Sequence, residues 1–568
     1  MRSMLLTLYV SIRLSASGFC KSSDIISHTR ASTFYSEHLN RQGRHLAGGR
    51  REACFSYKPN DKTIPLEFAH DIFFREGRNP KGNVTYTPRL LIADLRGSLG
   101  NLKTTGSLYD PPPSSANEAI AWSGKVTIHK AEPETKVPSG SSDKGVQRFP
   151  ADQDKDVCRV GHTPQLNRQV ESKKEPVQLW SEFLGVQLHP RTIHLITHYL
   201  HNNPDDPFDL FGIGNQCVED HEWRNSFMDD VRWFAEDCDS LQAFNILLDG
   251  HNGFTGLTSS LLEILHDDYP NKSSICWPLF QPLYNSINEG RVAVDMAHRH
   301  FNTVMCYHSL NRLSSAFCPL SVSISHFQPF LRDFKHLQFA GDLLPYDTSG
   351  VLGLALDNLM CALKLKSQPL EVPELVGQLC SPSKKLCVLG MGLPLGLGEL
   401  QLLADWTQSS SLAMLTPGAR YPAPSATNLA VMRGCTTNMV SKSPRRVQDP
   451  SEVVWRFAER VCEGSITWLR QVENPSRITL YGFPDIFGPF VTSTGLISCQ
   501  ARGAQTGVDH VPSLTCLQNG LAASDVVSEV VHRGRQLDLG RFHRCAVAGT
   551  EPDLYREALH SVQELGSS

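Results

Sequence analysis

"LLDGHNGFTGLTSSLLEIL", residues 247–265, joins an apolar run to three glycines and then to a helical pattern. The segment "AFNILLDG" (243–250) is short, apolar and typical of a buried strand. After the glycines, four leucines recur at the spacing of one helix face: Leu257, Leu261, Leu262 and Leu265. Strands that alternate with helices in this way predict an α/β fold with a mainly parallel sheet and crossover connections.

The glycine loop between this strand and this helix has the layout of a phosphate site. Backbone N–H groups at a helix N-terminus can bind an anion, and glycines let the chain approach it closely. His251 and Phe254 stand where further glycines would suit such a loop, and a phenylalanine in a left-handed conformation is strained. Two interpretations follow: a working phosphate loop, or a degenerate loop kept for its turn geometry. The residues predicted to contact phosphate in the first case are Gly250, Asn252, Gly253, Thr255 and Gly256.

The composition of the chain is that of an ordinary globular protein. It has 568 residues, of which 40% are hydrophobic and 20% charged, and its net charge is -4. This charge gives no basic field, so we expect no nucleic-acid partner. The 16 cysteines include no CxxC pair, which predicts reduced, mostly buried thiols and no zinc ribbon. No apolar run is long enough to predict a membrane-spanning helix.

The N-terminal segment allows three interpretations. "MRSMLLTLYVSIRLSASGFC" (1–20) has Arg2, a short apolar run and then small residues, as in a signal peptide. Residues 1–51 are rich in Arg and Ser and poor in acids, as in a mitochondrial transit peptide. The third interpretation is an unstructured or wrongly assigned N-terminus.

Polar and proline-rich stretches divide the rest of the chain. Residues 129–176 carry few large apolar side chains, which predicts a disordered linker. Residues 408–449 are rich in Ser, Pro and Thr and are predicted to form a long loop. "DPSEVVWRFAERV" (449–461) then predicts a helix that begins near Ser451.

Other combinations of reactive residues lack the partners that chemistry needs. His194, His198 and His201 have the spacing of one helix face, where two histidines can bind zinc, but no third ligand is evident. We therefore expect surface or half-buried histidines and no metal site. No GxSxG elbow occurs, so no catalytic residue is predicted.

Three long runs resemble the Misato family of tubulin-related proteins. They are "YTPRLLIADLRGSLGNLKTTGSLYD" (86–110), "WSEFLGVQLHPRTI" (180–193) and "FAEDCDSLQAFNILLDGHNGFTG" (234–256). The order of the tubulin motifs is also kept: Pro88-Arg89 comes first, the glycine loop follows, and Asp268-Tyr269-Pro270 stands where tubulins have "EEYP". The resemblance covers roughly residues 51–568.

The resemblance implies a tubulin-like α/β fold, in which a Rossmann-type parallel sheet domain precedes a second α/β domain and C-terminal helices. The predicted organisation is an unmatched, disordered N-terminus (1–50), the first part of the nucleotide-type domain (51–128), a linker (129–176), the rest of that domain (177–345) and the second domain (346–568).

The sequence departs from the tubulin pattern at three places. Arg96 stands where tubulins have an acid beside the nucleotide, and Ile120 and Ala121 replace small residues in the next loop. No counterpart of the family's first strand is evident before Arg51. A missing first strand would leave a gap in the central sheet.

What the resemblance implies about function is a non-enzymatic role in mitochondrial distribution, morphology and fusion, with spindle organisation as a related association. It places the protein in the cytoplasm and peripherally on the mitochondrial outer membrane. The expected partners are mitochondrial fusion or distribution factors, a chaperonin or microtubule components. No cofactor is expected; the alternative is a GTP-binding switch or GTPase of tubulin fold.

Overall fold

The apolar run near the N-terminus forms the central strand of the larger sheet. In the computed structural model, β1 (Ser3–Val10) pairs in parallel with β4 (Leu90–Arg96) on one side and with β6 (Ser240–Asp249) on the other. The prediction that no strand precedes Arg51 is therefore wrong for residues 3–10. The prediction failed because a short buried strand has the same composition as the apolar core of a targeting peptide. In addition, the strands that pair with β1 are distant from it in the sequence.

The structure describes the following residues: 3–10, 68–78, 84–99, 102–105, 188–201, 203, 205–280, 289–321, 336–339, 345–395, 412–419, 427–435, 450–462, 466–472, 476–477, 484–503, 507–520, 522–537, 544, 549 and 551–567. Residues 11–50, the predicted linker 129–176, Ile120 and Ala121 lie outside them. The boundaries predicted at 128/129 and 176/177 stay predictions, and the one at 345/346 coincides with the start of α7 (Pro345–Lys364).

The first sheet has seven strands, in the order β5-β4-β1-β6-β7-β8, with β9 also paired to β7. All of its recorded pairings are parallel. The strands not yet given are β5 (Ile193–Leu200), β7 (Ser273–Phe280), β8 (Ala316–Phe317) and β9 (Leu320–Ser321). The parallel α/β sheet predicted from the sequence is confirmed.

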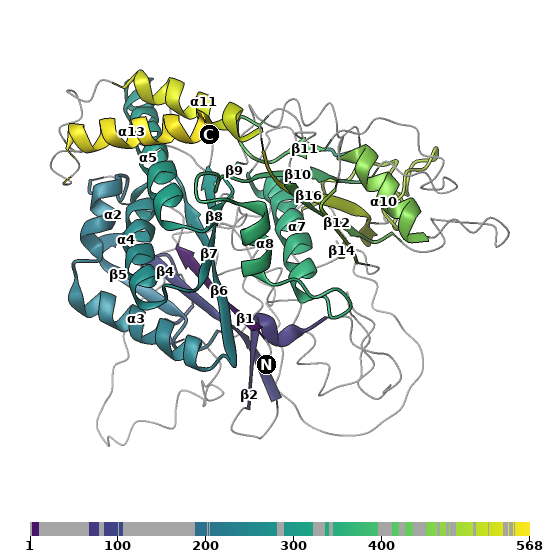
Figure 1. Ribbon diagram of the computed structural model, residues 1–568, viewed down its shortest axis with the longest axis horizontal. Helices are drawn as coiled ribbons and strands as arrows, with labels where there is room; N and C mark the ends of the chain where they lie inside the picture. Colours follow the sequence, from purple (N-terminus) through teal and green to yellow (C-terminus); the bar gives the residue numbers. More distant parts are fainter. Residues whose placement is uncertain are drawn as a thin grey trace, which may run out of the picture. The chain divides into compact units, whose positions relative to one another are not determined.

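Helices cover both faces of this sheet (Figure 1). Alternate residues of β4 and β6 point to opposite faces, so that Leu91 and Phe244 enter one core and Ile92 and Leu247 enter the other. The first core contains α2 (Phe211–Cys217), α3 (His221–Glu236), α4 (Gly253–Asp268), α5 (Glu289–Leu313), α11 (Ala522–Arg535) and α13 (Pro552–Ser567). The second core contains α7 and α8 (Val372–Leu379) and continues into the second sheet.

The second sheet is mixed and has five strands, in the order β11-β10-β16-β12-β13. Only the β12–β13 pairing is parallel. Its other face packs against α10 (Pro450–Val461). The strands are β10 (Val388–Gly392), β11 (Ala413–Met414), β12 (Thr427–Arg433), β13 (Trp468–Val472) and β16 (Ser513–Asn519).

The remaining described elements are short. Two two-stranded sheets pair β2 (Phe74–Arg78) with β3 (Val84–Pro88) and β14 (Ser476–Arg477) with β15 (His510–Val511). A 3-10 helix, η1, covers His70–Ile72.

Two further expectations about secondary structure are wrong. β11 and β12 lie within residues 408–449, which were predicted to form a loop. The strand segment "TNLAVMR" has only seven residues, so its apolar pattern is a weaker signal than the Ser- and Pro-rich composition around it. The three histidines do not share a helix face, because residues 193–200 form β5. His194 is buried, with Nε2 3.3 Å from Asp230 Oδ2, and His198 is exposed. In the part of the chain that the structure describes, no three His, Cys, Asp or Glu residues group as metal ligands.

A buried histidine just before β5 makes the fold sensitive to acid. The ring of His189 stacks on Trp233, with centroids 4.6 Å apart, and Arg75 and Arg191 lie over the same tryptophan ring. Burial, together with the charges of the two arginines, lowers the pKa of His189 from 6.5 to about 4. In the unfolded chain the ring binds a proton near pH 6.5, whereas in the folded chain it stays neutral to about pH 4.

The free energy of unfolding is therefore expected to fall as the pH is lowered from about 6.5 towards 4. Urea unfolding at a series of pH values, for the wild type and His189→Phe, measures this. The phenylalanine keeps a ring against Trp233 and should flatten part of the slope, whereas the exposed His198→Phe control should not. An unchanged slope in His189→Phe would contradict the assignment.

Candidate functional site

The glycine loop lies at the carboxyl ends of the central parallel strands. It follows β6 directly, and β1 ends beside it, because Val10 pairs with Leu248 on one side and with Ala93 of β4 on the other. In open parallel sheets this edge, where strand order reverses, is the usual place for a ligand. The site predicted from the sequence is therefore in the position that a nucleotide site of this fold would occupy.

Asn252 and Thr255 fasten the loop to the end of β6. The side chain of Asn252 caps α4: its Oδ1 accepts from the Phe254 amide at 3.0 Å, and its Nδ2 donates to Asp249 Oδ2 at 2.7 Å. The Thr255 hydroxyl donates to the carbonyl of Asp249 at 2.9 Å. Both side chains thus have protein partners within the loop itself.

Several backbone amides that a phosphate would need already donate to protein oxygens. Gly250 N–H donates to the Leu279 carbonyl at 2.9 Å, and Gly253 N–H to the Phe208 carbonyl at 3.3 Å. The Thr255 amide donates to the Asn252 carbonyl at 3.1 Å. These bonds satisfy the loop internally.

The glycines serve close packing and not a left-handed turn. None of the three has a positive φ. A Cβ at Gly250 would lie 2.5 Å from the Phe280 ring, and one at Gly253 would lie 2.8 Å from the Phe208 ring. A Cβ at Gly256 would lie 1.8 Å from the carbonyl oxygen of Phe211 in α2. Protein atoms therefore lie against the Cβ side of all three glycines.

Phe254 is correspondingly unstrained. The expectation of strain assumed a left-handed loop position, but Phe254 lies in the first turn of α4 and is fully buried. Its ring packs edge-on against Phe208, with centroids 4.9 Å apart. The residue that breaks the glycine pattern is a core residue.

Asn302 of α5 completes the loop and could not be found from the sequence. It is fully buried, and its Nδ2 donates to the carbonyls of His251 at 2.9 Å and Asp209 at 2.6 Å. Its Oδ1 accepts from the Phe211 amide, which begins α2, at 2.9 Å. Only the folding of α5 against the loop brings this side chain to it.

An acidic and a basic side chain, Asp249 and Arg299, both act on His251 of the loop. Asp249 is fully buried, and its Oδ1 is 2.7 Å from His251 Nδ1. Burial lowers the pKa of His251, with a smaller opposing effect of Asp249. Arg96, which stands where tubulins have an acid beside the nucleotide, is exposed at the end of β4. In the residues that can be described, the side chains of Asn252 and Thr255 and several loop amides bond to protein atoms, and phosphate binding by the five predicted residues stays a prediction.

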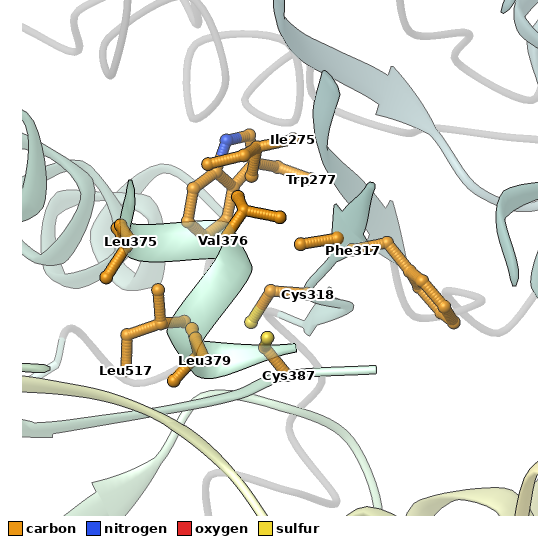
Figure 2. A pocket seen from close by; sticks show the side chains of 10 residues that line it. Ile275, Trp277, Phe317, Cys318, Leu375, Val376, Leu379, Cys387 and Leu517 are labelled. Carbon is orange, nitrogen blue, oxygen red and sulfur yellow. The ribbon is translucent and has the colours of Figure 1, made fainter. Parts of the chain in front are cut away.

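A small apolar cavity lies elsewhere, between α8 and the strands beside it (Figure 2). Its volume is about 10 Å³, which is the space of one water molecule. Trp277, Leu375 and Leu379 contribute to its lining. It is too small and too apolar for a nucleotide.

Comparison with known proteins agrees with this architecture. The family model "Misato Segment II tubulin-like domain" matches residues 49–142, and the model "Tubulin domain" matches residues 169–342, which include the glycine loop. The tubulin-like fold expected from the sequence is confirmed.

Relatives match along most of the chain. Protein misato homolog 1 of Homo sapiens is 28% identical over 567 residues, which cover 93% of this chain and 97% of that protein. Protein misato of Drosophila melanogaster is 26% identical, over 93% of this chain and 96% of its own length. Protein DML1 of Gibberella zeae is 28% identical over 283 residues, 48% of this chain and 49% of its own. The chain is thus similar to proteins of the Misato family of tubulin-related proteins along nearly its whole length.

Proposed function

We propose that this chain is a non-enzymatic organising protein that controls mitochondrial distribution, morphology and fusion, with a related role in spindle organisation. The observation that supports it is the packed glycine loop: the tubulin-like framework is present, but Gly250 and Gly253 of the loop pack closely against the rings of Phe280 and Phe208. A tubulin-like body without a working nucleotide loop would act through its surfaces.

The proposed partners are mitochondrial fusion or distribution factors, a chaperonin or microtubule components. The proposed locations are the cytoplasm and the outer face of mitochondria. Among the helices that the structure describes, none combines the length and the apolar character needed to cross a bilayer. Peripheral attachment through a protein or lipid contact is the form of membrane association that we propose.

The test is replacement of the endogenous protein in cells, with the mitochondrial network as the readout. Depletion should collapse or fragment the network, and the wild-type chain should restore it. A Thr255→Val variant present at the wild-type level should restore it as well, because nucleotide binding is not required; the lost hydrogen bond to Asp249 lowers stability, so protein levels are compared by immunoblot. A normal network after complete depletion would overturn the proposal.

The second candidate is a GTP-binding switch or GTPase of tubulin fold. It is favoured by one observation, the position of the loop at the carboxyl edge of a Rossmann-type parallel sheet. Under this alternative, Thr255→Val should abolish GTP binding and fail to rescue depleted cells.

Purified protein is expected to carry no GTP, because the loop amides and side chains are bonded to protein atoms. The measurement is the nucleotide released on denaturation, together with the melting temperature with and without GTP and Mg²⁺. No nucleotide should be released, and GTP with Mg²⁺ should leave the melting temperature unchanged. Stoichiometric release of GTP, lost in Thr255→Val, would establish the switch in place of the non-enzymatic proposal.

A further inference from the structure

Two cysteines meet across a tight turn where α8 leads into the second sheet. Cys380 caps the C-terminus of α8, and Cys387 immediately precedes β10. Between them, Ser381 and Lys384 exchange backbone hydrogen bonds of 3.3 and 2.9 Å, which closes the turn. The two Sγ atoms are 3.6 Å apart.

This separation is that of two thiols in contact, not of a disulfide. A disulfide needs an S–S distance of about 2.05 Å, so the sulfur atoms would have to approach by roughly 1.5 Å. The apolar cavity adjoins Cys387, as Figure 2 shows, and gives that side chain space to shift. Neither backbone segment has to be displaced far, because the turn already holds the cysteines side by side.

The surroundings give the two thiols different roles. The hydrogen bond with Cys387 lowers the pKa of Cys380, and Asn519 and the charge of Lys385 act in the same direction against the effect of burial. Asn519 Nδ2 lies 3.6 Å from Cys380 Sγ. The hydrogen bond with Cys380, and then burial, raise the pKa of Cys387 well above its usual range. Cys380 is thus the more acidic thiol of the pair and Cys387 the less acidic one.

Access to solvent follows the same division. Cys380 is half-buried beside a turn whose residues 381–384 are exposed, whereas Cys387 is 2% exposed. Cys380 is therefore the more exposed residue of the two. A more exposed, more acidic thiol beside a buried one is the arrangement of an attacking and a resolving cysteine.

We propose that Cys380 and Cys387 form an oxidation site that a peroxide converts to a disulfide. The Cys380 thiolate attacks one oxygen of hydrogen peroxide, the O–O bond breaks, and the departing hydroxide takes a proton to become water. Cys380 is then a sulfenic acid. Cys387 Sγ attacks Cys380 Sγ, the S–O bond breaks, and the hydroxyl leaves with the Cys387 proton as a second water. Two thiols are oxidised by two electrons, and one peroxide is reduced to two waters.

The disulfide would tie the end of α8 to β10. α8 packs on β6 and β7 of the first sheet and on β12 of the second, and Gln242 of β6 accepts from the Val372 amide at its start. The disulfide would therefore add a second covalent link between α8, which packs on the first sheet, and strand β10 of the second sheet. This inference concerns the chemistry of the chain and does not depend on the proposed cellular function.

The test is peptide mapping of the full chain after graded hydrogen peroxide treatment and alkylation of the remaining thiols. Trypsin cuts after Lys384 and Lys385, between the two cysteines, so the disulfide appears as two peptides joined by a bond that dithiothreitol breaks. We expect this joined pair in the wild type at peroxide doses that leave the exposed Cys499 unmodified.

Two variants separate the roles of the cysteines. Cys380→Ser should remove the joined pair, and Cys387→Ala should leave a sulfenic acid at Cys380 that dimedone labels. Cys499→Ser is the control and should not change the result. Oxidation of Cys499 before any joined pair forms in the wild type would overturn the proposal, as would a disulfide from Cys387 to Cys318. The wild-type result decides the matter even if a variant folds poorly.

Discussion

Gly256→Ala is expected to lower the free energy of unfolding by about 3 kcal/mol or more, which is a large fraction of the stability of a typical domain. An added Cβ would lie 1.8 Å from the Phe211 carbonyl oxygen. The oxygen is a backbone atom, and the Cβ is bonded directly to the backbone Cα. No rotamer change can relieve this contact, so α2 and α4 would have to move apart. The same close approach occurs at Gly214, where a Cβ would lie 1.7 Å from the Gly253 oxygen.

The measurement is urea unfolding of the wild type, Gly256→Ala and a matched glycine variant, Gly377→Ala. Gly377 also lies in a helix, α8, but nothing lies within 4 Å of its Cβ position. Its replacement should be neutral or stabilise by about 0.5–1 kcal/mol, because alanine favours a helix. If Gly256→Ala were as stable as Gly377→Ala, the packing of α2 on α4 would be contradicted. A stable variant that had lost bound GTP would favour a phosphate loop.

Arg433→Met is expected to cost about 3–5 kcal/mol of unfolding free energy, because it leaves the Asp357 carboxylate buried without its partner. The Arg433 guanidinium, 2% exposed, donates to Asp357 of α7 from the end of β12. The adjoining Asn358 donates to Ser513 and Thr515 of β16, each at 2.9 Å. This group of hydrogen bonds fixes α7 on the second sheet.

Denaturant unfolding of Arg433→Met should be compared with Arg556→Met. Arg556 pairs with Asp553 on α13, but both side chains are at least 70% exposed, so its loss should cost less than about 1 kcal/mol. In the double variant Asp357→Asn with Arg433→Met, part of the loss should be recovered because no charge remains buried. Equal losses of unfolding free energy in Arg433→Met and Arg556→Met would show that the buried pair stabilises the fold no more than the exposed pair does.

The sequence by itself determined the elements whose own pattern is strong. The period of Leu257, Leu261, Leu262 and Leu265 predicted α4, and all four are buried on it. The continuous apolar run before Gly250 predicted β6, and the family resemblance supplied the tubulin-like fold. These signals are local or extend over long runs, so they can be recognised from the sequence without the structure.

Only the tertiary structure shows what the glycines of the loop pack against. A glycine that approaches a phosphate and a glycine that approaches another helix are the same letter, and the difference here is the Phe211 carbonyl from α2. The strand nature of residues 3–10 was decided in the same way, by pairing with β4 and β6. Cys380 and Cys387 likewise became a pair through the turn between them. In each case the deciding contact is made by a residue that is close in space, and the local sequence around the first residue does not reveal that partner.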